Sequence, residues 1–184
     1  LGLRRPVGVL ISELYPDGPA ARAGLQPGDV IVELNRREVA EPKALRFKVA
    51  TLTIGGTASL TIIRRGQRRT LKLPIEPPPE MPKRNITKLA GRHYLAGATV
   101  ANLSPALAEE LSIDVMLRGV LVLTVARRSQ ARRIGLQPGD TIVRLNGTTL
   151  DTIKTLKAVI NRGTRRWTIA VRRDGKIITA RIDG

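Results

Sequence analysis

The sequence lacks cysteine, contains one histidine, and has an aromatic content of only 2%. The absence of cysteine excludes disulfide bonds and thiolate metal sites. It leaves the cellular compartment open, because cysteine-free proteins occur on both sides of a membrane. Hydrophobic residues nevertheless make up 42% of the chain, so the core must be built from aliphatic side chains. This composition is that of a packed globular protein and not of a disordered tail.

Long apolar runs are also absent. The longest, VGVLI at 7–11 and VLVLTV at 120–125, have the length of β-strands and are too short to cross a bilayer. The N-terminus does not read as a signal peptide. The chain opens on Leu1 and not on Met, so we expect it to be a piece of a longer protein.

One hexapeptide, GLQPGD, occurs twice, at residues 24–29 and at 135–140. At the same offset the matched pairs are GVL at 8–10 and 119–121, IV at 31–32 and 142–143, LN at 34–35 and 145–146, and Leu45 with Leu156. After an apparent deletion of three residues, Arg64 aligns with Arg172. The chain therefore holds two copies of one module, each large enough to close a small core.

Each copy has the same order of predicted elements. An apolar strand runs into a short helix of small residues that ends at Gly24 or Gly135, where a left-handed conformation is needed. QPGD then predicts a type II turn, because Pro fixes φ at the second position and Gly accepts a positive φ at the third. A strand, an amphipathic helix and a closing hairpin complete each copy. The expected strands are 8–14, 30–35, 59–65 and 70–75, then 119–125, 141–146, 167–173 and 178–183, with hairpin turns at GQ (66–67) and DGK (174–176).

A proline-rich stretch, LPIEPPPEMPKR at residues 73–84, separates the two copies. Its prolines favour polyproline II geometry and a semi-rigid spacer. We therefore expect a first domain at 1–75, a linker at 76–93 and a second domain at 94–184. The single histidine, His93, falls in this linker and is expected to be solvated.

The second copy carries an N-terminal extension that the first copy lacks. Residues 94–117 precede its GVLV strand, whereas only LGLRRPV at 1–7 precedes the GVLI strand of the first copy. The opening strand of the first module is therefore expected to be missing from this chain.

The order of elements in each copy resembles that of bacterial PDZ domains: a GVLV strand, a small-residue helix, a GLQPGD turn, an IVxLN strand and an amphipathic helix. The segment LAGATVANLSPALAEEL, residues 95–111, is similar to the ligand-binding strand and short helix of PDZ domains in the HtrA/Deg serine proteases. The resemblance implies an α+β, β-rich fold of two PDZ domains joined by a Pro-rich linker. Each would be a small, partly open β-barrel or sandwich capped by two helices.

The family further implies a periplasmic, trypsin-like protease of protein quality control, whose tandem PDZ domains bind peptides and recruit substrates. The expected partners are hydrophobic C-terminal peptides or unfolded proteins, and the parent's own protease domain. A ligand would add as a strand beside residues 98–102. Three residues of this strand would pair with the ligand: Thr99, Val100 and Ala101.

Three consecutive amides would bind the ligand's carboxylate, those of Ala96, Gly97 and Ala98. The opposite wall would be a helix face at every fourth residue, formed by Thr152, Leu156 and Ile160. The matching positions of the first copy, expected to form a vestigial groove with one wall, are Glu41, Leu45 and Val49. The second module should then bind peptides and the first should bind poorly. Gly97→Val is expected to weaken binding without unfolding, since a Cβ would crowd the carboxylate.

Plainer roles remain open for these positions. The hexapeptide GLQPGD has a purely structural alternative role: its residues would form the turn, and Asp29 or Asp140 would accept hydrogen bonds from nearby amides. Leu156 and Ile160 would serve equally as core residues, since a helix on a sheet buries one such stripe.

No catalytic site is expected within the chain. It has no GxSxG or GDSG arrangement, and a Ser-His-Asp triad needs a histidine held between a nucleophile and a carboxylate. No cofactor or metal site is expected either, because one histidine and scattered carboxylates do not make a closed ligand set. If the parent is a protease, we expect its triad upstream of Leu1.

The formal net charge is +17, from 32 basic and 15 acidic residues. The charge is that of an ordinary solvated, arginine-rich surface, but such a field also attracts polyanions, so a module that binds polyanions or an anionic membrane surface is an alternative function. Specific nucleic-acid recognition is not expected, because the basic residues are spread over both copies and few aromatic side chains are available for base stacking. A further alternative is the PDZ pair of a membrane-embedded metalloprotease.

Overall fold

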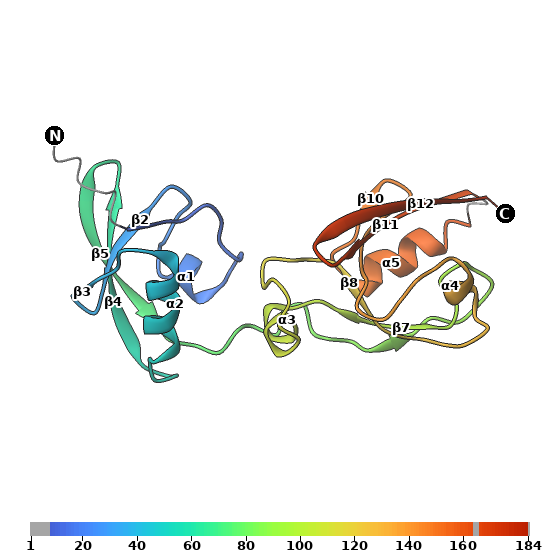
Figure 1. The fold of residues 1–184 in the computed structure, drawn as a ribbon, viewed down its shortest axis with the longest axis horizontal. Helices are drawn as coiled ribbons and strands as arrows, with labels where there is room; N and C mark the ends of the chain where they lie inside the picture. The colour runs from blue at the N-terminus through green and yellow to red at the C-terminus, as the bar shows by residue number, and fades with distance from the viewer. Residues whose placement is uncertain (1–7, 164–165, 184) are drawn as a thin grey trace. The chain divides into compact units, whose positions relative to one another are not determined.

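The computed structural model describes residues 8–163 and 166–183 and divides the chain into two compact units, Leu1–Pro79 and Glu80–Gly184. Each unit has its own sheet and its own core, and the sheets carry most of the regular structure (Figure 1). The expected β-rich α+β fold is confirmed, and in the described ranges both sheets are open. No helix among these residues has the length and apolar character that a bilayer crossing requires.

The first unit is an antiparallel sheet in the order β1-β2-β4-β5, with β3 paired to β2. Its elements are β1 (Val9–Leu10), α1 (Pro19–Arg22), β2 (Val30–Leu34), β3 (Arg37–Glu38), α2 (Pro42–Ala50), β4 (Thr57–Arg64) and β5 (Gln67–Pro74).

The second unit repeats this plan and adds elements before it. The added elements are β6 (Thr87–Lys88), β7 (Ala98–Asn102) and α3 (Pro105–Glu110). The repeated ones are β8 (Val120–Val125), α4 (Gln130–Arg133), β9 (Thr141–Leu145), β10 (Thr148–Thr149), α5 (Ile153–Ile160), β11 (Arg166–Arg173) and β12 (Lys176–Asp183). The sheet order is β12-β11-β9-β8-β7-β6, with β10 paired to β9. The short helix expected within 95–111 is α3, and α4 and α5 are the two helices expected in each copy.

Two local predictions need correction. The strand expected at 8–14 is reduced to β1, which in the described residues pairs with β2 alone, whereas its counterpart β8 lies between two strands. The first hairpin turn is centred on Arg65 and Gly66, one residue earlier than expected. Both residues have positive φ (50° and 75°), as Asp174 and Gly175 do in the second hairpin (49° and 76°), which is the twist that closes a two-residue hairpin.

The domain boundary also differs from the expected one. Residues 80–93, expected to be linker, belong to the second unit, because β6 pairs with β7 and Leu89 is buried in that unit's core. No helix or strand lies between β5 and β6. The linker is therefore shorter than the proline-rich composition suggested.

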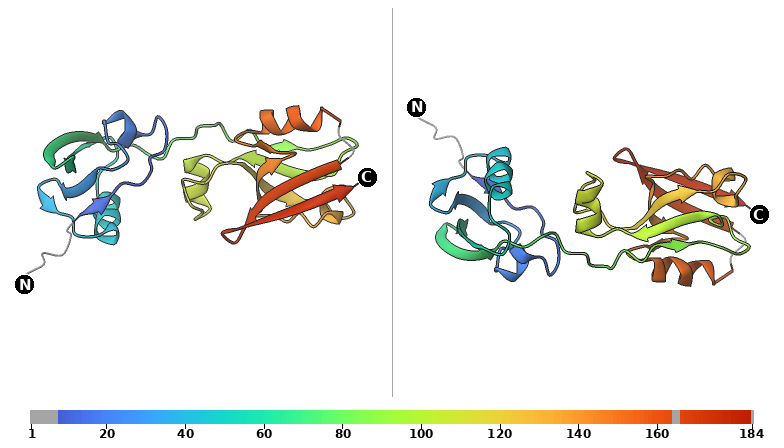
Figure 2. Two further views of the ribbon diagram at one scale, coloured as in Figure 1. Left: turned by 90° about the horizontal axis from the view of Figure 1, so that it is seen from above. Right: turned by 90° about the horizontal axis from the view of Figure 1, so that it is seen from below.

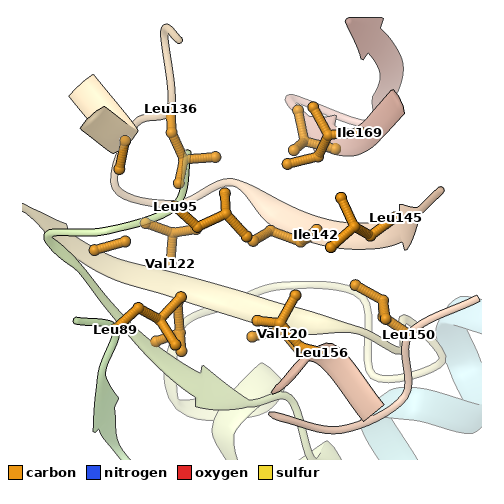
Figure 3. Packing of buried hydrophobic residues seen from close by; sticks show 14 of the residues in the cluster. Leu89, Leu95, Val120, Val122, Leu136, Ile142, Leu145, Leu150, Leu156 and Ile169 are labelled. Atoms are coloured by element: carbon orange, nitrogen blue, oxygen red, sulfur yellow. The ribbon is translucent and has the colours of Figure 1, made fainter. Parts of the chain in front are cut away.

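Aliphatic side chains fill both cores, as the low aromatic content requires. The core of the second unit includes Leu95, Val122, Ile142 and Leu156, which come from the loop before β7, from β8, from β9 and from α5 (Figure 3). It also holds Trp167, the only tryptophan of the chain.

The repeated aspartate of GLQPGD holds each unit's turn against its sheet. Asp29 is 1% exposed and accepts two hydrogen bonds from Arg64, each at 2.7 Å, and one from the Gln26 amide at 2.8 Å. The same guanidinium donates to the Gly24 carbonyl at 2.6 Å, which ties down the end of α1. The hydrogen bonds from Arg64 hold the pKa of the Asp29 carboxyl below its ordinary value, against the effect of burial.

The second unit repeats this arrangement with Asp140 and Arg173. Arg173 donates to the two carboxylate oxygens at 2.6 and 2.7 Å and to the Gly135 carbonyl at 2.9 Å. Arg64 therefore corresponds to Arg173 and not to Arg172, so the deletion between the copies is one residue shorter than the alignment gave. The expected bonds from Asp29 and Asp140 to nearby amides are confirmed.

The buried aspartate gives a stability test. Asp140→Ala should lower the free energy of unfolding of the second unit by about 3 kcal/mol, because it leaves the Arg173 guanidinium and the Gln137 amide without their acceptor. Trp167 fluorescence in urea reports this unit alone.

Asp183→Ala is the control, because the Arg166–Asp183 pair is exposed on the surface and such pairs contribute about 0.5 kcal/mol or less. Equal losses from both variants would contradict the role assigned to Asp140.

Candidate functional site

The strand β7, expected to be the ligand-binding edge, pairs along both of its edges. One edge pairs with β8 over the whole strand. The other pairs with β6, in the register Thr87↔Val100 and Lys88↔Thr99. The chain itself thus supplies a neighbouring strand on the edge where a ligand was expected to add, and the pairing of residues 98–102 with a ligand stays a prediction.

The strand β6 is the centre of a longer segment, Arg84–Leu89, which we call the resident segment. At its C-terminal end, the Leu89 amide donates to the Ala98 carbonyl and the Leu89 carbonyl accepts from the Gly97 amide, both at 2.8 Å. At its other end, the carbonyl of its first residue accepts from the Asn102 amide at 2.7 Å. The resident segment thus runs antiparallel to β7 over the strand's full length.

The three amides expected to bind a carboxylate are engaged within the protein. Ala96 and Ala98 donate to carbonyls of the loop that precedes β7, at 3.0 and 3.2 Å. Gly97 donates to Leu89 of the resident segment. Of the three, only the Gly97 amide faces the resident segment, and the binding of a ligand carboxylate by these amides stays a prediction.

The helix expected opposite β7 is α5, and its apolar face is buried. Leu156 is fully buried, Ile160 packs against the same cluster, and the Thr152 hydroxyl caps the helix by accepting from the Thr155 amide. Leu89, which is 3% exposed, belongs to this cluster as well (Figure 3). In the right view of Figure 2, the short green strand β6 lies on the side of β7 that faces the orange helix α5.

Asn102 of β7 connects this strand to α5 and to the start of the resident segment, which together form the groove between β7 and α5. Its Oδ1 accepts from the Ile153 amide at the start of α5 at 2.6 Å, and its Nδ2 donates to the Lys83 carbonyl at 2.8 Å. Arg84 adds ion pairs to Glu110 of α3 at 2.9 Å and to Glu80 at 3.0 Å. The entry of the resident segment into the groove is therefore fixed by polar contacts, and its exit by Leu89.

The corresponding surface of the first unit is incomplete. Glu41 is the N-cap residue of α2 without a side-chain cap, Leu45 is half-buried on the core, and Val49 is exposed. In the described ranges β1 has no second neighbour, and Leu10 on it is 64% exposed. The expected missing strand would precede Gly8, and residues 1–7 lie outside the described residues.

His93 is not a solvated linker residue. Its ring is stacked on the indole of Trp167, with 6.2 Å between the ring centroids. The ring of Tyr94 packs edge-on against the same indole, with 5.3 Å between the centroids. Its Nδ1 accepts from the Leu95 amide at 3.2 Å, so Nε2 carries the proton and donates to the Ala90 carbonyl at 3.1 Å. Burial lowers the pKa of His93 below its ordinary value. The neutral imidazole thus shapes the loop between β6 and β7.

Gly97 is constrained by packing as well as by its amide. Its φ is 90°, and a Cβ would lie 2.3 Å from Cβ of Ser129, the residue that caps α4. Gly97→Val would therefore strain the fold itself, which corrects the expectation that it is a clean probe of binding.

The signal for the resident segment was present in the sequence. NITKL at 85–89 contains two β-branched residues and ends in Leu, directly after the prolines. The prolines before it favour a linker and so mask this strand signal. Across the described ranges, no group of three or more His, Asp or Glu side chains is placed to hold a metal ion.

The half-buried His93 predicts a pH dependence. His93 binds protons less readily in the folded than in the unfolded chain, so the unfolded state takes up more protons as the pH falls. The stability of the second unit should be fully present above about pH 6.5 and decrease below it. The measurement is the thermal midpoint from Trp167 fluorescence at pH 7.5 and 5.5.

His93→Asn is the comparison, because it removes the only histidine of the chain. The difference between the two midpoints should shrink in this variant. An unchanged difference would show that other groups cause the pH dependence.

Comparison with known proteins agrees with this architecture. A family model described as "PDZ domain" matches residues 3–75 and 95–183. Two probable periplasmic serine endoproteases, DegP-like, are similar in sequence. The protein of Pseudomonas fluorescens is 34% identical, over 83% of this chain and 32% of the relative. The protein of Pseudomonas fulva is 32% identical, over 93% of this chain and 36% of the relative. The chain thus spans about a third of the length of these relatives.

Among solved structures, the HtrA3 PDZ domain bound to the phage-derived ligand FGRWV is 31% identical, with a TM-score of 0.42 over 47% of this chain and 81% of that one. The HtrA-type protease AlgW with a decapeptide is 36% identical, with a TM-score of 0.37 over 42% and 25%. Because the family model covers both repeats, the chain belongs to the PDZ domain family and contains two copies of that domain.

Proposed function

We propose that this chain is the tandem PDZ region of a periplasmic serine endoprotease of the HtrA/Deg type. The similar relatives are named as such endoproteases, and this chain matches about a third of their length. In such a protein, the two PDZ units would recruit unfolded or C-terminal segments of substrates and regulate the protease domain of the same chain.

The peptide site of this proposal is the groove between β7 and α5. The observation that carries it is that this groove already holds an extended segment, antiparallel to β7 and bonded to it through the main chain. Strand addition of this kind gives affinity through backbone hydrogen bonds and specificity through alternate side chains. The groove therefore has the geometry that a peptide ligand needs.

The ends of the groove indicate the ligand's chemistry. At one end the Gly97 amide bonds the Leu89 carbonyl, in the place where a ligand's terminal carboxylate would lie. Next to it, the core cluster that contains Leu156 accepts an aliphatic side chain. A peptide with an apolar last residue and a free carboxylate satisfies both features.

A second candidate function follows from the charge. The net charge of +17 favours polyanions, and a polar cavity of about 410 Å³ beside the first GLQPGD is lined by Arg64, Arg65 and Arg69. An anionic membrane surface or an acidic client segment would bind such a surface through salt-sensitive contacts.

The two candidates are separated by one binding experiment. A labelled peptide ending in a free leucine and its C-terminally amidated twin are titrated with the chain, followed by fluorescence anisotropy at low and high salt. We expect amidation to weaken binding by about 10- to 100-fold, the loss of one charge-assisted hydrogen bond, and salt to have a small effect. If both peptides bind with equal affinity and this affinity falls at high salt, the result would contradict the PDZ-groove proposal and favour the polyanion candidate.

A further inference from the structure

We propose that the resident segment, Arg84–Leu89, is a built-in ligand that closes the peptide groove of the second unit, so that an external peptide binds there only by displacing it. This inference rests on the proposed function, since it takes the groove between β7 and α5 as the peptide site. It adds that this site is occupied by residues 84–89 of the same chain.

The direction of the resident segment is that of a bound C-terminal peptide. Its last residue, Leu89, lies at the Gly97 end of β7, and its first residue lies at the Asn102 end. The Leu89 carbonyl takes the Gly97 amide that a terminal carboxylate would use. An external peptide would need the same hydrogen bonds, so the two occupants exclude each other.

The side chains of the resident segment alternate as those of a ligand strand do. Leu89 is buried in the core cluster and Thr87 is half-buried, whereas Lys88 is exposed and Ile86 is 61% exposed. Period-two alternation places Thr87 and Leu89 on one face. The buried face of the resident segment thus carries Thr87 and Leu89, the two side chains that an external peptide would have to replace.

Strand β6, the centre of the resident segment, has the fewest paired residues along the path of its sheet. It pairs with β7 over two residue pairs, and three further main-chain hydrogen bonds hold the ends of the segment, whereas β11 and β12 pair over eight. The ion pairs of Arg84 with Glu80 and Glu110 lie at the surface and contribute little. Local opening draws on the elements with the fewest such contacts, so exchange of this strand requires no unfolding of the rest of the unit.

A reversible disulfide tests whether the resident segment blocks the site. Lys88 and Thr99 are cross-strand partners, and opposed residues of antiparallel strands have Cα distances of about 4.5 to 5.5 Å, within the range that a disulfide spans. The chain has no cysteine of its own, so Lys88→Cys with Thr99→Cys forms a single defined bond. The probe is the synthetic peptide KRNITKL, the sequence of residues 83–89, with a free carboxylate.

We expect the reduced double variant to bind this peptide and the oxidised form to lose binding by at least about tenfold, because the apparent dissociation constant rises as the fraction of open groove falls. The basic residues of the peptide also reduce its attraction to the +17 surface. Equal, carboxylate-dependent binding by both forms would overturn the inference and leave the proposed function standing.

A matched pair of truncations gives a second test. Leu89→Ala removes the buried anchor of the resident segment, and Ile86→Ala truncates an exposed residue of the same segment. Leu89→Ala should bind KRNITKL at least about tenfold more tightly than the wild type, and Ile86→Ala within about twofold of it. Trp167 fluorescence checks that each variant is folded, and if Leu89→Ala is unfolded the disulfide pair decides alone.

The outcomes separate the two proposals. Leu89→Ala binding no better than Ile86→Ala, with both folded, would overturn the built-in ligand. No carboxylate-dependent binding by any form, including the reduced cysteine variant, would overturn the proposed function and this inference with it.

Discussion

The structure of the second unit depends on one constraint: a buried strand must satisfy the hydrogen-bonding groups on both of its edges. Ala98, Val100 and Ala101 of β7 are fully buried, so unpaired amides there would be costly. Strand β8 satisfies one edge and the resident segment the other. The resident segment is therefore a structural element as well as the proposed occupant of the peptide groove.

The same constraint explains the difference between the two units. In the first, β1 corresponds to β8 but lacks a counterpart of β7 in the described ranges, and it shrinks to two residues. Helix α2 has no fully buried residue, and Phe47 on it is 73% exposed, whereas α5 buries Ile153, Leu156 and Val159. Two modules with one sequence pattern thus differ in how completely the helix is covered.

Local chemistry made most of the fold predictable. Gly28 and Gly139 adopt the positive φ that QPGD requires, and the buried aspartates bond the expected amides. The guanidinium that each aspartate binds was not predictable, because Arg64 and Arg173 lie far along the chain and the copies align there with a one-residue uncertainty. The sequence predicted the elements of the candidate site, β7 and α5, but not that the resident segment pairs with β7. Strand pairing of this kind depends on tertiary contacts.

The loop at residues 90–96, shaped by His93, is also a tether between the resident segment and the strand it pairs with. A short tether gives its segment an effective concentration in the millimolar range, against which any free ligand must compete. Ligands of modest affinity would then leave the groove closed. Multivalent or locally concentrated peptides would open it, and the length of this loop would set that threshold.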